Sequence, residues 1–320
     1  MISLCSEVLL KRGELETYEE QCENASQVAK DVMDAIEEGY TFVLVYGSGP
    51  QLTAELMIQD FTKDLISWPL HANIAKVQGL VGHIIQLALI NEAKKRRSNA
   101  RFATVLTHTL LDSDSTSSRS FCFPVGVFLT KDEMKRRSVL PSKEKKRVFA
   151  EVTNGIYRKV VASPEPKNVI EGRIIKKLVA DGINVVACLC GGVPIIDRGL
   201  YIPVEAVIDR DLISAKIATL VGATTLVFLT HVDGIFVPFS SRQATLLRQV
   251  STSAVRKYCE EGHIKGGMSR KVRASLKFTQ FGGKRAIVAP IGKLTASLKG
   301  LAGTHILKDT NVVDPHTKAQ

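Results

Sequence analysis

The sequence lacks the features that mark secreted, fibrous and membrane proteins. Six cysteines are scattered over 320 residues, too sparse for a disulfide framework, so we expect reduced thiols. The longest apolar runs, such as Leu226–Leu229, are far shorter than the roughly 20 residues that cross a bilayer. No charged segment followed by an apolar run opens the chain. These absences predict a cytoplasmic protein without a membrane segment.

Negative charge and aromatic residues are also scarce. Lys and Arg outnumber Asp and Glu by 43 to 32, which gives a formal charge of +11 and suits a polyanionic ligand. The basic runs Lys94–Arg97 and Lys131–Arg147 contain no aromatics at stacking spacing, and we find no nucleic-acid-binding motif. We interpret them as a solvated helix end and a loop, and we expect small-molecule phosphates rather than nucleic acid as partners.

Short β-branched runs alternate with amphipathic segments along most of the chain. Apolar residues at helical spacing predict helices around Val28–Ile36 and Ile74–Ala88, and also over Leu212–Leu220 and Ser269–Phe278. This alternation is typical of an α/β domain with a mainly parallel sheet. The expected strands are Ile2–Leu4, Thr41–Tyr46, Ala103–Thr107, Asn184–Ala187, Thr225–Leu229, Ala286–Ala289 and Thr304–Leu307.

The alternation is interrupted once, from Asp112 to Pro166, where the sequence is Ser-rich, basic and bounded by proline. So long an excursion is too large for an ordinary connection, and it predicts a small lid that protrudes from the sheet.

Small residues follow two of the predicted strands, at Gly47-Ser48-Gly49-Pro50 and at Gly191-Gly192. Ligands of open α/β sheets bind at the carboxyl ends of the strands. A glycine turn there lets backbone N–H groups approach an anion, although a single such turn is usually ordinary turn chemistry. Because both turns follow strands of one sheet, together they indicate a cleft that handles phosphate.

Nine segments resemble carbamate kinases, in the same order and at similar spacing over about residues 2–307. They are SLCSEVLLKRGE, VYGSGPQL, VQGLVGHIIQLALINE, RKVVASPEPKNVIE, CGGVPII, VEAVIDRDLISAKIATLVGA, LTHVDGIF, EEGHIKGGMSRKV and LAGTHI. The resemblance implies the amino-acid kinase fold, a three-layer αβα sandwich with a mainly parallel sheet and a small protruding lid subdomain. It also implies one domain over residues 1–320. Within that domain, 1–111 and 167–204 would bind carbamate or phosphate, 112–166 would form the lid, and 205–320 would bind the nucleotide.

The activity implied by the resemblance is reversible phosphoryl transfer between ATP and carbamate, as in arginine catabolism. Such enzymes use ATP or ADP with Mg²⁺ and are typically homodimers. The resemblance implies a catalytic cluster of Lys271, Arg210 and Asp211. It implies substrate- or phosphate-binding roles for Gly47, Ser48, Gly49, Gly191, Gly192 and Ser6. It implies nucleotide-binding roles for Thr230, His231, Asp233, Gly234, Pro290 and Met268, with packing as the alternative for Met268.

Several positions depart from the family pattern where its chemistry takes place. Cys5-Ser6-Glu7 stands where the family has Gly-Gly-Asn, and Leu189-Cys190 replaces two glycines of a four-glycine run. Phe123 aligns with a lysine that the family sends down from the lid, and His231 replaces an aspartate. Arg210 replaces a lysine, which keeps the charge but changes its shape. The lid residues Lys143, Lys145 and Lys146 are candidates to supply the missing cation.

Two functions therefore remain open: a carbamate kinase-like enzyme with impaired activity, and a non-catalytic homologue that binds nucleotide as a subunit or sensor. The sequence also raises a zinc site, because Cys5, Cys188 and Cys190 follow strands that should converge near His108 or His231. Small buried cysteines are the favoured interpretation, so we expect no metal-binding residues of the protein's own.

Overall fold

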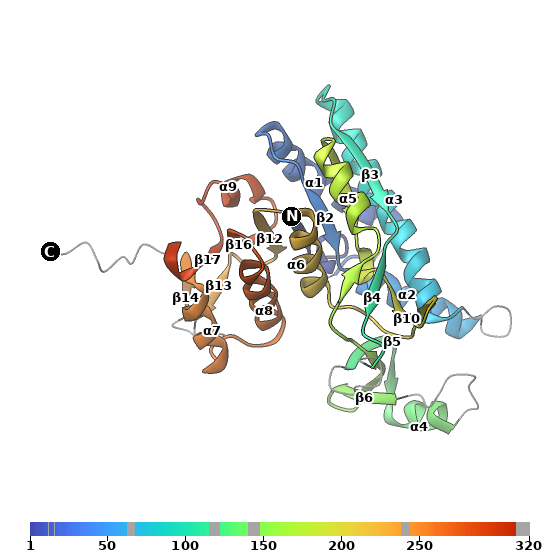
Figure 1. Cartoon of the computed structure of the whole chain (residues 1–320). Helices are drawn as coiled ribbons and strands as arrows, with labels where there is room; N and C mark the ends of the chain where they lie inside the picture. The colour runs from blue at the N-terminus through green and yellow to red at the C-terminus, as the bar shows by residue number, and fades with distance from the viewer. Residues whose placement is uncertain are drawn as a thin grey trace.

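The computed structural model describes residues 1–311 apart from 12, 16, 63–67, 115–121, 140–147 and 238–243. Its largest element is an eight-stranded sheet, in which neighbouring strands are parallel except for one pair (Figure 1). The order across the sheet is β15 (Gln249–Ser251), β17 (Thr304–Leu307), β16 (Arg285–Pro290), β12 (Thr225–Thr230), β1 (Ile2–Leu4), β2 (Val43–Tyr46), β9 (Ile183–Ala187) and β3 (Arg101–Val105). All seven expected strands occur, and β15 is an addition.

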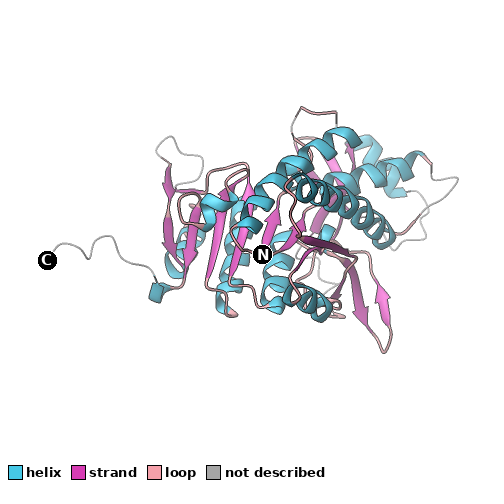
Figure 2. Ribbon diagram, turned by 90° about the horizontal axis from the view of Figure 1, so that it is seen from above, coloured by secondary structure: helices cyan, strands magenta, loops and turns pink. Residues whose placement is uncertain are grey.

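Helices cover both faces of this sheet, as Figure 2 shows from above. One face carries Leu44, Val186 and Val227, which pack in one core with residues of α1 (Tyr18–Glu37), α3 (Leu70–Lys95) and α9 (Leu294–Leu298). The opposite face carries residues such as Val45 and Phe228. They pack against α5 (Gly172–Ala180), α6 (Arg210–Val221), α7 (Thr252–Glu260) and α8 (Gly266–Gln280). Burial on both faces explains the unbroken apolar strands and confirms the three-layer fold.

A separate antiparallel sheet, ordered β5-β7-β6, projects from the main body together with α4 (Lys131–Val139) (Figure 1). Its strands are β5 (Cys122–Thr130), β6 (Val148–Thr153) and β7 (Ile156–Ala162). It lies within the segment expected to form the lid. An ion pair of 2.7 Å between Arg137 of α4 and Asp60 ties it to α2 (Gly49–Phe61).

Two further small sheets were not expected from the sequence. One has the order β11-β10-β4-β8, with β4 (His108–Leu111), β8 (Asn168–Val169), β10 (Val193–Asp197) and β11 (Tyr201–Pro203). The other is the hairpin of β13 (Ile235–Val237) and β14 (Thr245–Leu247). The first of them lies at the root of the lid, because β4 precedes residue 112 and β8 follows residue 166.

Helix α3 is the one helix in the described part of the chain whose length and hydropathy would let it cross a membrane. In its most apolar window, 56% is buried inside the molecule, and it packs along α1. A core helix of a folded domain meets the same criterion, so this helix carries no argument for a membrane.

Candidate active site

A cavity of about 810 Å³ opens at the carboxyl ends of β1 and β2, beneath the lid. The main body contributes Cys5, Ser6 and Glu7 after β1, and Gly47, Ser48, Gly49 and Pro50 after β2. The lid contributes Phe123, Phe128 and Arg158. The start of α6 contributes Asp209, Arg210 and Asp211, and α8 contributes Gly267 and Arg270. Residues from five distant stretches of the sequence therefore meet at one place, where parallel α/β sheets hold their ligands.

The turn after β2 aims the start of α2 at this cavity. Ser48 precedes the helix, and Pro50 occupies its first turn, where a missing N–H costs nothing. The Ser48 side chain is buried, and its hydroxyl has no hydrogen-bond partner among the residues that the structure describes. A helix N-terminus attracts anions, and a buried hydroxyl without a partner needs a hydrogen bond from somewhere. A phosphate or carboxylate oxygen in the cavity would supply it.

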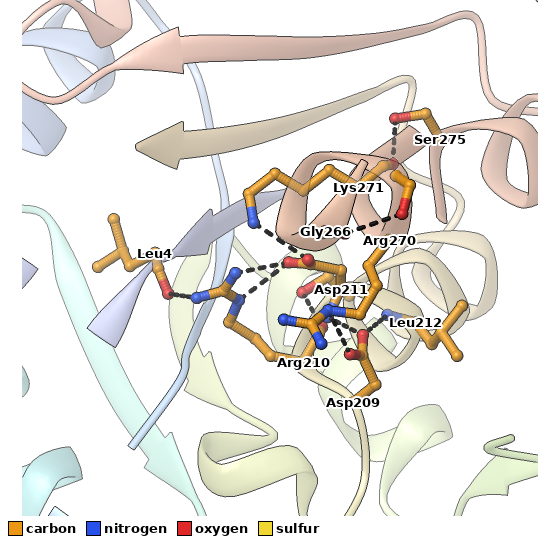
Figure 3. Close-up of polar contacts among 11 residues, drawn as sticks. Leu4, Asp209, Arg210, Asp211, Leu212, Gly266, Arg270, Lys271 and Ser275 are labelled. Atoms are coloured by element: carbon orange, nitrogen blue, oxygen red, sulfur yellow. Dashed lines mark hydrogen bonds and ion pairs between the residues drawn. The ribbon is translucent and has the colours of Figure 1, made fainter. Parts of the chain in front are cut away.

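The most deeply buried charge of the site is the carboxylate of Asp211, whose side chain is 4% exposed. Arg210 donates to its Oδ1 from Nη2 at 2.7 Å and from Nε at 3.0 Å, and Lys271 Nζ donates to its Oδ2 at 3.1 Å (Figure 3). Burial alone would raise the pKa of Asp211, but the two cations hold this pKa below its ordinary value. The carboxylate therefore stays ionised, and it fixes Arg210 at the cavity wall and Lys271 on the carboxylate's other oxygen.

Arg210 reaches this position because Gly47 has no side chain. A Cβ on Gly47 would lie 3.0 Å from Cδ and Nη1 of Arg210, closer than such atoms usually pack. Nη1 of Arg210 also donates to the carbonyl of Leu4 at 3.1 Å, so the guanidinium joins the ends of β1 and α6. Glycine at this turn thus serves the close approach of a cation rather than an unusual backbone angle.

A second acidic residue, Asp209, directly precedes α6 and caps it. Its Oδ1 accepts from the backbone N–H groups of Asp211 at 2.9 Å and Leu212 at 3.1 Å, which caps the helix. Its Oδ2 lies 3.5 Å from Nε of Arg270, whose side chain is 59% exposed. Arg270 was not singled out from the sequence, although it precedes Lys271 in the same motif.

The lid places an arginine and two aromatic rings in the cavity. Arg158 of β7 donates from Nη2 to Thr53 Oγ1 at 3.1 Å and to the Gly126 carbonyl at 2.8 Å. Its guanidinium also lies 4.6 Å from the ring centre of Phe128. Phe123, where the family resemblance implied a lysine, lines the same cavity. The described part of the lid therefore does contribute a cation, Arg158, which sequence reasoning missed. The lysine candidates Lys143, Lys145 and Lys146 lie outside the described residues.

Gly191 and Gly192, expected beside the substrate, are not among the described residues that line the cavity, although their neighbour Cys190 is. Both adopt positive φ, and a Cβ on Gly191 would come within 2.6 Å of the Ile208 carbonyl oxygen. Cys190 itself keeps φ at 54°, a left-handed conformation that suits the glycine of the family pattern. These glycines hold the loop tightly against the segment that leads into α6.

Replacing Gly191 by alanine should test this packing against a matched position. Gly199 has nearly the same φ, +83° against +84°, but open space where its Cβ would lie. The left-handed conformation alone costs an alanine roughly 1–2 kcal/mol, and overpacking adds about 1–3 kcal/mol. We expect Gly191→Ala to lower the free energy of unfolding by about 1–3 kcal/mol more than Gly199→Ala, measured by urea denaturation. Equal losses would mean that the loop simply shifts.

None of the residues expected to bind the nucleotide lines this cavity. Thr230 and Pro290 are register partners at the ends of β12 and β16, so they do lie together. Asp233 is exposed, and Gly234 packs against Thr304. His231 pairs with Glu7, at 3.2 Å between Nε2 and Oε2. Met268 packs against the core under α8, consistent with the packing alternative. Their nucleotide roles stay predictions.

The zinc ligands that the sequence raised as an alternative do not come together as a set. In the described part of the chain, one group of three potential ligands is close enough to hold a metal, and it contains neither Cys188, Cys190 nor His108. Burial raises the pKa of both Cys188 and Cys190 to about 12. The Cys188 backbone N–H donates to Thr107 Oγ1, whereas Cys190 Sγ lies 3.9 Å from the Ser48 carbonyl. Both cysteines are therefore packing residues.

Comparison with known proteins fits this geometry. Residues 13–290 match the model of the amino acid kinase family. The chain belongs to this family. It is 36% identical to the carbamate kinase of Pyrococcus furiosus, over 96% of this chain and 98% of the relative. It is 33% identical to the carbamate kinase-like protein YahI of Escherichia coli, over 96% and 98%. The carbamate kinase of Giardia lamblia bound to AMP-PNP superposes with a TM-score of 0.88, at 28% identity and over 96% and 98% of the two chains.

These similarities make the chain a carbamate kinase homologue over nearly its whole length. Its similar relatives include proteins called carbamate kinases and one called carbamate kinase-like. Sequence similarity alone therefore does not set the level of activity, which depends on the residues of the site.

Proposed function

We propose that the protein is a carbamate kinase-like phosphotransferase that works slowly. In the ATP-forming direction, an oxygen of the ADP β-phosphate would attack the phosphorus of carbamoyl phosphate, and carbamate would leave. The observation that carries this proposal is the buried Asp211 carboxylate. It holds Arg210 at the wall of a cavity faced by the start of α2, and it holds Lys271 directly behind that wall. Phosphoryl transfer depends mainly on such fixed positive charge around the moving group.

The charge balance of the cavity argues for a low rate. Among the described residues that line it, three arginines (Arg158, Arg210 and Arg270) face three carboxylates (Glu7, Asp209 and Asp211). Lys271 adds one positive charge through its contact with Asp211. A transferring phosphoryl group carries several negative charges, and each missing cation or backbone donor costs roughly 10²–10³ in rate. Glu7 adds repulsion at the position where the family pattern has a neutral asparagine.

The alternative is a homologue that binds nucleotide without turnover. Phe123 and Glu7 favour it, because both replace groups that would contact an anion with groups that do not. Arg158 favours residual catalysis, because it brings a lid cation to the same cavity. We therefore place slow catalysis first.

The deciding experiment couples ATP formation from carbamoyl phosphate and ADP to a luminescent readout, with ADP binding measured separately by thermal shift. We expect ADP to raise the melting temperature, since a ligand of the native state stabilises it. We expect turnover well below the ordinary kinase range of about 1–100 per second. Lys271→Met should abolish that residual turnover. The non-catalytic alternative would be favoured if ADP binds but the wild type shows no more turnover than Lys271→Met.

The position of the nucleotide is part of the same proposal. We place it over the C-terminal half, near Thr230, Asp233, Pro290 and Lys271. The first three lie at or just after the ends of the neighbouring strands β12 and β16, and Lys271 follows Gly266-Gly267-Met268 in α8. A thermal shift by ADP that survives both Asp233→Ala and Lys271→Ala unchanged would contradict this placement. Mg²⁺ with the nucleotide, a homodimer, a role in arginine catabolism and the division into two binding halves stay predictions from the family resemblance.

A further inference from the structure

Three side chains of different chemistry converge beside the cavity: the thiol of Cys5, the carboxylate of Glu7 and the imidazole of His231. One potential ligand atom from each lies within 4.8 Å of the other two. Oε2 of Glu7 and Nε2 of His231 are 3.2 Å apart. In the part of the chain that the structure describes, this is the one such group of three or more.

The main chain holds these residues at fixed positions. Cys5 and His231 directly follow β1 and β12, which are parallel neighbours with Leu4 opposite Leu229. The backbone N–H of Cys5 donates to the Leu229 carbonyl at 3.3 Å, so the hydrogen bonding between the two strands continues as far as Cys5. The short helical turn that carries Glu7 is fixed by Tyr46, whose hydroxyl donates to the Ser6 carbonyl at 2.7 Å.

The spacing suits tetrahedral zinc. Zinc–oxygen and zinc–nitrogen bonds of about 2.0–2.2 Å put oxygen and nitrogen ligands roughly 3.3 Å apart, and a thiolate at about 2.3 Å lies roughly 3.6 Å from either. The Glu7–His231 separation of 3.2 Å already matches the first value. The Cys5 sulfur lies at most 4.8 Å from the Glu7 oxygen and the His231 nitrogen, so it would need to move toward them by at most about 1.2 Å. Side-chain torsions can supply that movement.

The ligand types decide which metal class fits. Thiolate and imidazole suit zinc and similar borderline cations, whereas Mg²⁺ prefers six oxygen ligands in near-octahedral geometry. We propose that Cys5, Glu7 and His231 form a three-ligand site for a zinc-type divalent cation at the edge of the cavity. On binding, the Cys5 thiol releases its proton to solvent and the thiolate bonds to the metal. The inference rests on this geometry and does not require that the protein is a kinase.

The proposed metal site lies where a bound ion could contact molecules in the cavity. Cys5 and Glu7 line the 810 Å³ cavity, whereas Glu7 and His231 line a second cavity of about 530 Å³ next to it. Three protein ligands leave a fourth position for water or an anion, as in zinc sites that bind substrates. All three residues are also departures from the family pattern, so the site would be a feature of this chain rather than of the family as a whole. A bound dication would offset the charge of Glu7.

Cobalt provides the test, because a thiolate bonded to Co²⁺ gives a charge-transfer absorption that imidazole and carboxylate ligands do not. We expect the reduced, full-length protein to show this band on titration with Co²⁺, and Zn²⁺ to abolish it stoichiometrically. Excess Mg²⁺ should leave it unchanged. Cys5→Ser should remove the band, and Glu7→Gln and His231→Gln should each weaken Zn²⁺ affinity more than about 100-fold, since even outer-shell changes cost 10–100-fold. The affinity is read by competition with a chromophoric chelator.

The chain contains a matched control. Cys259, Glu261 and His263 offer the same three residue types, with Nε2 of His263 3.5 Å from Oε2 of Glu261, yet they form no such cluster. Cys259→Ser and His263→Gln should therefore change neither the band nor the affinity. Glu7 and His231 are 46% and 42% exposed, so their variants should fold. A wild-type titration without the thiolate band, or equal losses in the Cys5 and Cys259 variants, would overturn the proposal and indicate an adventitious ion only.

Discussion

Replacing Asp211 by asparagine is expected to lower the free energy of unfolding by about 3–5 kcal/mol, the usual cost of removing one partner from a buried charge group. The cost arises because two buried cations would lose their counter-ion. The side chains of Arg210 and Lys271 are only 17% and 11% exposed, and both direct N–H groups at this carboxylate. An amide of the same shape cannot balance two buried cations. Adding Lys271→Met to the variant should restore part of the lost stability, because one uncompensated charge is removed.

Glu165 is the matched control for this prediction. It too contacts one arginine and one lysine, Arg273 and Lys277, but its side chain is 43% exposed. Surface ion pairs contribute about 0–1 kcal/mol, so Glu165→Gln should cost at most about 1 kcal/mol. Urea denaturation of both variants measures the contrast. Similar small losses at the two sites would mean that water reaches the Asp211 cluster.

The pH dependence follows from the lowered pKa of Asp211. A carboxyl whose folded-state pKa is depressed contributes stability that is fully present above its unfolded pKa, about 3.9. That contribution is lost as the pH falls through the folded-state pKa. The stability difference between wild type and Asp211→Asn should therefore stay constant from about pH 5 to pH 8 and shrink only below about pH 4.

The main sheet was predictable because its strands are buried on both faces. Val43–Tyr46 and Leu226–Leu229 are continuous apolar runs in the sequence for that physical reason. Strands such as Tyr201–Pro203 are short and exposed, so they carry no such pattern and were missed. The lid was found only as an interruption of the α/β alternation. Its internal strands lie on a small sheet that buries few residues, which weakens their periodicity.

The candidate site was predictable where residues follow strands and not where the lid brings them in. The placement of Gly47–Pro50 and of Arg210–Asp211 follows from strand order and motif spacing. Arg158 lies 105 positions from Thr53, its hydrogen-bond partner, and nothing in a single sequence links the two. The cluster of Cys5, Glu7 and His231 likewise depends on the pairing of β1 with β12. Sequence reasoning placed Cys5 and His231 near each other but joined them to the wrong cysteines.

The largest gain in activity is expected from a fourfold variant that restores the family pattern: Cys5→Gly, Ser6→Gly, Glu7→Asn and Phe123→Lys. Most of the effect should come from two changes, because Glu7→Asn removes a repulsive carboxylate and Phe123→Lys adds a cation under the lid. The glycines should matter less, since the loop at Cys5 already has an extended backbone at φ −73°. One well-placed donor or cation is worth roughly 10²–10³ in rate, so we expect ATP formation to rise by at least about 10²-fold. Both proteins are assayed in buffer from which zinc has been removed, so that metal bound at Cys5 of the wild type does not affect the comparison.

Two control variants test whether the rate depends on the position of the added charge and on Lys271. Phe128→Lys adds the same charge at another lid position of the cavity, but beside Arg158 and on a side chain that is 64% exposed, so it should raise the rate far less. Adding Lys271→Met to the fourfold variant should return the rate to the background, because the restored site still needs that cation. A wild-type turnover already within about 1–100 per second would refute the impaired function. Arg158, Lys143 and Lys145 would then be the sources of the missing charge, and alanine at the responsible residue would lower the rate.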